Sequence, residues 1–512
     1  MRHRQLFASL AAALMLAAAV PAIAQSAATG KSEAGDKAAA KPSREPKESI
    51  TRHSGAFNGR SISYDAVAGE IFLKDADGKP KAAIYSTSYI KTPRDATRPV
   101  VFLFNGGPGS GSLWLHMGAF GPKRVVVPSD ARDDGAPPYP IVHNPHALLD
   151  IADFVFIDPV GTGFSRALEG TDAKDYWGVT ADAKSIASFI RLWLTQHNRW
   201  NSPKFLGGES YGTTRSIAVA QELEGSYNDV ALNGILLIST ILDFGLSAET
   251  PGNEMAYVVN LPSYAATAWY HGKIANRPAK VADFVDEARR FAIGPYLAAL
   301  AQGNSLSDPE RIRVRAELAR LTGLSEAYLD RARLRVSPGR FYKELLRDRS
   351  LVVGRLDSRY TGRDADDAGE FAENDPSFYG IDAAYTAAMN AYARETLKYS
   401  PEIEYNVIGG VGPWDWRIGQ QRGGTAYVSV APFVGPLLRQ NSGLRIFVAQ
   451  GWYDHATPFF AAEYALNRTG IPQERIEWQY YDAGHMMYVN EPDLVKLNGD
   501  IRRFIENRTT GR

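Results

Sequence analysis

An apolar run that ends in Gly-Glu-Ser-Tyr-Gly, at residues 204–212, is the feature that most constrains the fold of this chain. The pattern Gly-x-Ser-x-Gly is typical of a nucleophile elbow, in which a serine sits on a tight turn between a strand and a helix. Because such a turn strains the serine backbone, we expect Gly208 and Gly212 where a Cβ would collide with a neighbouring strand or helix. An ordinary strand-to-helix turn remains the alternative, since short Gly/Ser patterns also arise by chance.

Short apolar segments that alternate with helical patterns surround this sequence. Continuous apolar runs, as found in strands covered on both faces, predict buried strands at residues 100–104, 154–157, 235–238 and 446–449. Residues 179–194 carry apolar side chains at helical spacing between two of these strands. Buried strands that alternate with helices indicate an α/β fold with a mostly parallel central sheet.

Other patterns mark where the sheet begins and where it is interrupted. Strand-like segments between residues 62 and 90 flank Asp77-Gly78, which predicts a hairpin at the edge of the sheet. From about residue 246 to residue 400 the chain reads as helices and loops. We therefore expect a core formed by residues 51–245 and 401–512, with a helical cap insertion at 246–400 over the mouth of the core.

The N-terminal segment has a different composition. Two arginines, an apolar stretch and the small residues up to Ala24 indicate a secretory signal peptide at 1–24. An uncleaved membrane anchor is the alternative, although the apolar stretch is short for a span of about 20 residues. Residues 25–50 contain almost no large apolar side chain before the first strand-like segments, which predicts a disordered tether. We expect a periplasmic or secreted bacterial protein with no stable membrane span after cleavage.

Charge and cysteine content exclude several classes of function. The chain has 57 lysines and arginines against 57 aspartates and glutamates, so it has no general electrostatic reason to bind nucleic acid. It has no cysteine, which excludes disulfides, a cysteine nucleophile and thiolate metal sites. An acidic stretch at 364–370 lacks the ligand spacing of an EF-hand and is interpreted as a solvated loop. We expect neither a metal nor a cofactor, and the oligomeric state stays open.

A serine hydroxyl needs a base, normally a histidine, and a carboxylate that orients the base. On an α/β-hydrolase sheet the chain order is serine, acid, histidine, with the last two on loops after later strands. One late strand-like segment leads into Asp454 and the final one leads into His485. We therefore expect Ser210, Asp454 and His485 to meet. Taken alone, His485 could instead be a packed core histidine and Asp454 an ordinary loop acid. His455 is a rival base, but it lies beside the acid on the same turn and cannot easily face it.

Four motifs make the sequence resemble the serine carboxypeptidase family, peptidase family S10. They are Asn-Gly-Gly-Pro-Gly-Ser at 105–110, Phe-Ile-Asp-Pro-Val-Gly-Thr-Gly-Phe-Ser at 156–165, the Gly-Glu-Ser-Tyr-Gly elbow, and Gly-His-Met-Met-Tyr at 484–488 followed by Glu491-Pro492. The resemblance runs from about Val100 to the C-terminal helix and is weakest through the cap.

The resemblance implies an α/β-hydrolase fold and hydrolysis of C-terminal peptide bonds through an acyl-enzyme on the same serine, aspartate and histidine. It also implies that the backbone N–H groups of Gly107 and Tyr211 form the oxyanion hole. Asn105 and Glu209 would bind the free carboxylate of a peptide substrate. Two carboxylates repel each other unless they share a proton, so Glu209 predicts binding that is tightest at acidic pH.

The sequence also departs from the family. Leu103 stands where the family usually has tryptophan, and Ser110-Gly111-Ser112 follows the Gly-Pro-Gly where cysteine and serine are usual. These differences leave the acylation machinery intact and leave strict exopeptidase action open. An acyltransferase or esterase on the same triad is therefore one alternative, and a non-catalytic binding protein is a second.

Overall fold

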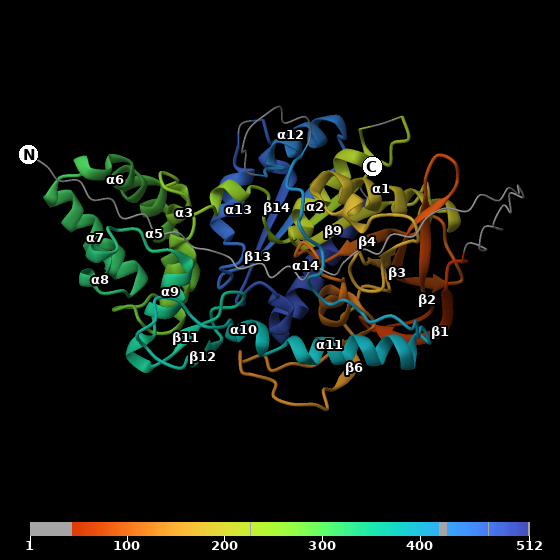
Figure 1. The fold of residues 1–512 in the computed structure, drawn as a ribbon, viewed down its shortest axis with the longest axis horizontal. Coiled ribbons are helices and arrows are strands. Elements are labelled where there is room, and N and C mark those ends of the chain that lie inside the picture. The colour runs from red at the N-terminus through yellow and green to blue at the C-terminus, as the bar shows by residue number, and fades with distance from the viewer. Residues whose placement is uncertain (1–43, 226, 419–427, 469, 510–512) are drawn as a thin grey trace, which may run out of the picture. The chain divides into compact units, whose positions relative to one another are not determined.

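A mixed β-sheet forms the centre of the computed structural model, which describes residues 44–225, 227–418, 428–468 and 470–509 (Figure 1). The strands of this sheet are β1 (Glu48–Phe57), β2 (Arg60–Lys74), β3 (Pro80–Thr92), β4 (Val100–Phe104), β7 (Asp153–Ile157), β8 (Arg166–Ala167), β9 (Lys204–Ser210), β10 (Gly234–Thr240), β13 (Arg445–Gly451) and β14 (Ile476–Tyr481). Two small ladders lie outside it: β5 (Lys123–Val125) with β6 (Ile141–His143), and β11 (Val352–Val353) with β12 (Thr361–Gly362).

The strand order in the sheet is β1-β2-β3-β7-β4-β9-β10-β13-β14, with β8 paired to β3. From β7 to β14 every neighbouring pair is parallel. The strands β1, β2 and β3 form an antiparallel edge, and β3 pairs antiparallel with β7. The carboxyl ends of the parallel strands therefore meet at one edge, where side chains that follow them can gather.

Some of the α-helices cover the two faces of the sheet, and others belong to the insertion. The α-helices are α1 (Val179–Gln196), α2 (Tyr211–Leu223), α3 (Met255–Val258), α4 (Leu261–Tyr270), α5 (Val281–Phe291), α6 (Leu297–Gln302), α7 (Asp308–Thr322), α8 (Glu326–Arg331), α9 (Pro338–Glu344), α10 (Pro376–Tyr379), α11 (Asp382–Ala391), α12 (Ala431–Gln440), α13 (Phe459–Leu466) and α14 (Glu491–Thr509). Short π-helical turns occur at Leu115–Phe120, Ala292–Tyr296 and Tyr392–Thr396.

Both faces of the parallel strands are buried, which explains their continuous apolar sequences. In β4, Val100, Phe102 and Phe104 pack into one hydrophobic cluster with residues of α1, α2, α12 and α13. The alternate residues Val101 and Leu103 pack into a second cluster with residues of α11 and α14. The expected α/β-hydrolase sheet with its buried strands is confirmed.

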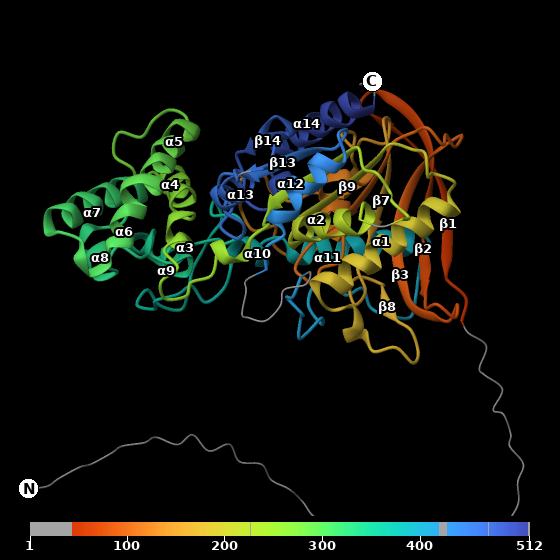
Figure 2. The same ribbon diagram turned by 90° about the horizontal axis from the view of Figure 1, so that it is seen from above.

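The segment predicted as a cap, residues 246–400, has two parts. Helices α3 to α9 gather in a lobe at one side of the sheet (Figures 1 and 2), and α7 ends at Gly323 in the left-handed conformation, with φ of 69°. The remainder, residues 351–400, runs back along the core through β11, β12, α10 and α11. There α11 contacts β5 and the π-helical turn Leu115–Phe120.

The N-terminal edge is longer than the sequence patterns suggest. Strand β1 begins at Glu48, within the segment predicted as a tether, and pairs with β2 over its whole length. The predicted signal peptide at 1–24 and residues 25–43 lie outside the described residues. Residues Glu45–Arg512 form one compact unit. None of the helices described is both long and apolar enough to cross a bilayer.

The acidic stretch at 364–370 folds around a lysine. The Lys343 ammonium is only 2% exposed, and it donates to Asp364 Oδ2 and to the carbonyl oxygen of Asp366, each at 2.6 Å. Arg340 pairs with Glu370 on the same stretch. Across the described residues, no group of three or more histidine, aspartate and glutamate side chains is arranged to hold a metal ion.

Candidate active site

Ser210 is the last residue of β9 and has a strained backbone, with φ of 62° and ψ of −130°. A Cβ on Gly208 would overlap the carbonyl oxygen of Gly212, and one on Gly212 would lie 2.9 Å from the carbonyl oxygen of Phe104. Both glycines are therefore required by close backbone approach, as expected for a nucleophile elbow. The strain keeps the serine side chain on the outside of the turn, at the edge of the sheet.

His485 and Asp454 are held together on loops that follow β14 and β13. The distance from His485 Nδ1 to Asp454 Oδ2 is 2.8 Å, and both side chains are buried. Asp454 also accepts hydrogen bonds from the backbone N–H groups of Ala456 and Thr457 and from the Thr457 hydroxyl. This carboxylate is fixed by its own loop, so it fixes the imidazole and leaves Nε2 for the neighbouring cavity.

The electrostatic surroundings of His485 suit a general base. Burial disfavours the imidazolium, but the charge and hydrogen bond of Asp454 outweigh it, so the pKa of His485 lies above its ordinary value. Glu209 adds to this effect, and the positive charge of Arg355 opposes it. A proton taken by this imidazole is therefore stabilised by the aspartate behind it.

Asn105 and Glu209 meet beside the elbow. Asn105 Nδ2 donates to Glu209 Oε1 at 2.9 Å, and Asn105 Oδ1 accepts from the Leu115 N–H at 3.1 Å. The other oxygen of Glu209 accepts from the Tyr488 hydroxyl at 2.7 Å. Burial raises the pKa of Glu209 to about 7, against the opposing effects of His485 and of these hydrogen bonds. Near neutral pH the protonated and ionised forms of this carboxyl are therefore both populated.

The loop after β4 touches the elbow. A Cβ on Gly106 would lie 2.5 Å from the backbone nitrogen of Tyr211, so only glycine allows this approach. Gly107 follows with φ of 103°, a conformation that favours glycine. Tyr211 is the first residue of α2, and the first N–H groups of a helix have no partner within it. The two N–H groups predicted as oxyanion donors thus belong to loops in direct contact.

A buried ion pair stabilises the contact between the loop after β4 and the elbow. Arg215 Nε lies 2.6 Å from Asp182 Oδ2, and both side chains are almost completely buried. A second nitrogen of Arg215 donates to the carbonyl oxygen of Asn105 at 2.5 Å. The guanidinium lies against the rings of Phe104 and Tyr211. One arginine on α2 thereby ties the loop after β4 to the elbow.

These groups open onto one cavity of about 350 Å³. Its apolar lining comes mainly from Trp114, Leu356, Phe378, Ile408 and Met486. Its polar lining includes Asn105, Gly107, Ser110, Glu209, Ser210, Arg355, Asp375 and His485. Ser210 and His485 therefore face the same space, together with the Asn105–Glu209 pair. The Ser110 hydroxyl, where the resemblance leads one to expect cysteine, accepts a hydrogen bond from the Trp114 indole at 3.0 Å.

Residues 354–358, here called the strap, join the insertion to the histidine loop. The N–H of His485 donates to Leu356 O at 2.6 Å, and the N–H of Gly484 donates to Asp357 Oδ2 at 3.0 Å. Ser358 N–H donates to the carbonyl oxygen of Tyr453, next to the acid, at 3.0 Å. The insertion thus holds the loops of Asp454 and His485 through hydrogen bonds to their backbones. The strap and α10, rather than the lobe, supply the insertion's share of the cavity wall.

His455, the rival base, has a different environment. Its Nε2 lies 2.7 Å from the Thr267 hydroxyl of α4, and its ring stacks with those of Tyr264 and Phe341. Burial lowers the pKa of His455 to about 3. A neutral imidazole packed into the insertion links the acid loop to the lobe and takes no part in the cavity around Ser210.

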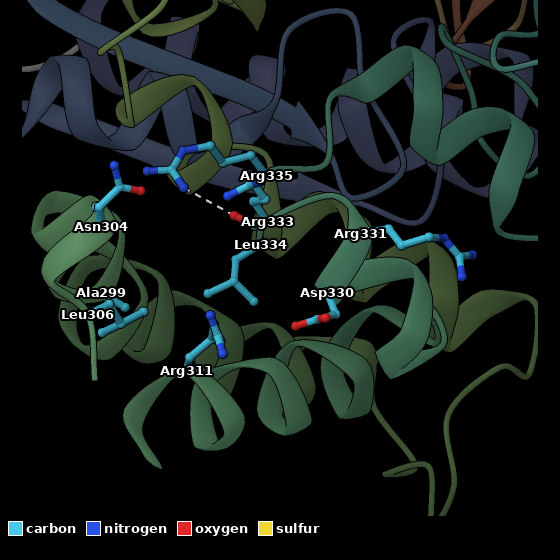
Figure 3. Close-up of a pocket in the computed structure, with 10 residues that line it drawn as sticks. Ala299, Asn304, Leu306, Arg311, Asp330, Arg331, Arg333, Leu334 and Arg335 are labelled. Atoms are coloured by element: carbon cyan, nitrogen blue, oxygen red, sulfur yellow. Dashed lines mark hydrogen bonds between the residues drawn. The ribbon is translucent and has the colours of Figure 1, made fainter. Parts of the chain in front are cut away.

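A larger cavity, about 640 Å³, lies in the lobe and away from Ser210 (Figure 3). Arginines dominate its polar lining, but two of them already have partners: Arg335 pairs with Glu254 and Arg311 pairs with Asp308. Asp330 also lines it and pairs with Arg315. The contacts hold α3, α7 and α8 together, which is a structural role.

Sequence patterns did not identify several residues that shape the site. Tyr488 lies within a recognised motif, but its hydrogen bond to Glu209 has no local sequence signal. The strap has no recognisable sequence signal either, because it lies in the insertion, where the resemblance to the family is weakest. Asp182 and Arg215 could have been suspected, since they are charged residues on the apolar faces of two predicted helices.

Part of the chain is similar in sequence to known proteins. The model of the serine carboxypeptidase family matches residues 77–280. Serine carboxypeptidase-like 16 of Arabidopsis thaliana is 29% identical over 205 residues, which are 39% of this chain and 45% of the relative. Serine carboxypeptidase-like 46 of the same plant is 27% identical over 226 residues, 42% of each chain. The matches thus span less than half the length of these relatives.

A solved structure supports the fold over a longer stretch. Kex1(Δ)p, a prohormone-processing carboxypeptidase from Saccharomyces cerevisiae, aligns with a TM-score of 0.52 and 14% identity, over 87% of this chain and 92% of that one. At this identity the likeness extends to the fold alone.

The buried carboxyl of Glu209 predicts a pH-dependent contribution to stability. Its pKa rises from 4.5 to about 7 on folding, so the stabilisation is complete below pH 4.5 and is lost as pH rises through 7. Glu209→Gln has no proton to lose. Relative to wild type, we therefore expect the variant to gain about 2.5 kcal/mol in the free energy of unfolding between pH 5 and pH 8.

Calorimetry at both pH values measures this difference. The exposed Glu474→Gln serves as the matched control, with the same offset from wild type at pH 5 and pH 8. An advantage of Glu209→Gln that is identical at the two pH values would contradict a raised pKa for Glu209.

Proposed function

We propose that this chain is a serine-type carboxypeptidase that removes C-terminal residues from peptides, and the match of residues 77–280 to the serine carboxypeptidase family model supports this proposal. The observation that carries the proposal is the hydrogen-bonded pair of Asn105 and Glu209 in the cavity of Ser210. A protonated carboxyl next to an amide can bind the carboxylate of a substrate. A plain esterase has no need for such a carboxylate-binding pair. The site thus supports recognition of a free C-terminus.

The proposed reaction assigns one role to each of these residues. Ser210 Oγ attacks the carbonyl carbon of the last peptide bond while His485 Nε2 takes the hydroxyl proton. The N–H groups of Gly107 and Tyr211 donate to the developing oxyanion, and Asp454 stabilises the imidazolium. The peptide bond breaks, His485 gives the proton to the leaving amine, and the C-terminal amino acid departs. Water then attacks the acyl-enzyme with His485 again as base.

The proposal includes export from a bacterial cell. The supporting observation is the basic, apolar and small-residue sequence of residues 1–24. Fractionation of a bacterium that expresses the full chain is expected to give a periplasmic or extracellular protein whose first residue is Gln25. A protein that stays in the membrane with residues 1–24 attached would contradict this localisation.

Peptide products test the reaction itself. We expect mass spectrometry of a mixed peptide pool to show stepwise loss of C-terminal residues, with peptide amides resistant because they lack the carboxylate. Ser210→Ala should lower the rate at least about 10⁴-fold and abolish labelling by a serine-directed phosphonate. Internal cuts, or turnover of plain acyl esters without turnover of peptides, would contradict carboxypeptidase action. Absence of phosphonate labelling would identify a binding protein.

The pH dependence of binding tests the role of Glu209. With a pKa of about 7, Glu209 carries the proton that it would share with the substrate carboxylate below neutral pH and loses it above. The KM for a free-acid peptide should therefore rise about tenfold between pH 6 and pH 8, as the protonated fraction falls. Glu209→Gln should make KM nearly independent of pH over this range.

Dissociation constants measured on Ser210→Ala separate this effect from titration of the catalytic base. The matching peptide amide is the control ligand, since it has no carboxylate to share a proton. A constant KM for the free acid across pH 5 to 8 would remove Glu209 from the carboxylate site.

A further inference from the structure

The backbone of Arg355, in the strap, is fixed on both sides. Its N–H donates to Asp375 Oδ1 at 2.9 Å, and its carbonyl oxygen accepts from the His455 N–H at 3.1 Å. The next residue of the strap holds the backbone of His485. The Cα of Arg355 therefore has a set position relative to the catalytic loops, and its side chain starts from the wall of the cavity.

The guanidinium of Arg355 has no acidic partner within the described residues. The side chain is exposed and lines the cavity that Ser210 and His485 also line. Asp375 lines the same cavity, but its carboxylate accepts from the backbone N–H groups of Arg355, Leu356 and Ser377 and from the Ser377 hydroxyl. The positive charge of Arg355 nevertheless reaches the catalytic imidazole, since it acts to lower the pKa of His485.

The other charged groups that line the cavity already have hydrogen-bond partners within the protein. Glu209 bonds to Asn105 and Tyr488, and His485 bonds to Asp454. Apolar groups, among them Trp114 and Phe378, form much of the remaining wall. An unpaired guanidinium beside apolar surface suits a ligand with a short apolar stem and a carboxylate at its end.

We propose that Arg355 makes the enzyme selective for peptides with an aspartate or glutamate side chain on one of the two residues joined by the scissile bond. This inference rests on the proposed carboxypeptidase function, because the terminal carboxylate is assigned to Asn105 and Glu209. Arginine stays charged throughout the neutral range, so the selectivity is independent of pH. The contribution of Glu209 to binding changes with pH, so it can be distinguished from the selectivity due to Arg355.

Matched peptides that differ in one charge test the proposal. Two pairs of N-acetylated tripeptides are used, Ala-Ala-Glu with Ala-Ala-Gln and Ala-Glu-Ala with Ala-Gln-Ala, bound to Ser210→Ala so that no turnover occurs. In one of the pairs we expect the glutamate peptide to bind about two- to fivefold more tightly at low salt, as for an ion pair in contact with solvent. The preference should shrink at high salt.

Variants assign the preference to one residue. Added to Ser210→Ala, Arg355→Gln should reduce the glutamate-to-glutamine affinity ratio to one, and Arg355→Lys should retain part of it. Arg290→Gln is the matched control, because Arg290 is an exposed arginine of the same insertion and does not line the cavity. It should leave the ratio unchanged.

Three outcomes would overturn the proposal: a ratio of one in both pairs, a ratio that survives Arg355→Gln, and an equal loss of affinity for glutamate and glutamine peptides in Arg355→Gln. The last would mean that Arg355 binds the terminal carboxylate. A failure of the carboxypeptidase function itself would be seen separately, because the wild-type protein would then hydrolyse none of the four peptides. The ratio of affinities for the glutamate and glutamine peptides could still be measured.

Discussion

Two backbone loops that follow neighbouring parallel strands touch each other, and the remainder of the site depends on this contact. The loop after β4 approaches the elbow after β9 so closely that Gly106 has no room for a Cβ next to the nitrogen of Tyr211. The contact places Asn105 against Glu209, and both residues line the same cavity as Ser210. The buried pair of Asp182 and Arg215 holds it, since Arg215 binds the carbonyl oxygen of Asn105.

The sequence predicts those parts of this arrangement whose cause is local. Apolar runs predict β4, β7, β10 and β13, because strands covered on both faces have no polar positions to interrupt them. The helical spacing at 179–194 predicts α1, which the structure extends to Gln196. The chain order of serine, acid and histidine predicts that Ser210, Asp454 and His485 gather at one edge. Nδ1 of the histidine and the carboxylate indeed lie 2.8 Å apart.

Other parts could not be predicted because their partners are distant in the sequence. Strand β1 carries alternating exposed residues and is stabilised by pairing with β2, so its composition resembles that of a loop. The strap is a short irregular segment in a helical insertion, and the hydrogen bonds by which it holds the loops of Asp454 and His485 join residues about 100 or more positions apart. Arg355 has no motif around it. Its place in the cavity follows only from the fixed path of the strap.

The strap also limits how the insertion can vary. A lobe joined to a core by two free linkers could be exchanged for another lobe without effect on the reaction centre. Here Leu356 and Asp357 supply acceptors to the backbone of the histidine loop, so the chain that returns from the lobe is part of the scaffold that positions His485. Evolution can remodel α3 to α9 with less effect on the histidine loop than the strap, except where Thr267, Tyr264 and Phe341 contact His455. A chimera that replaced the whole insertion would lose the support of its own imidazole, whatever the quality of the grafted lobe.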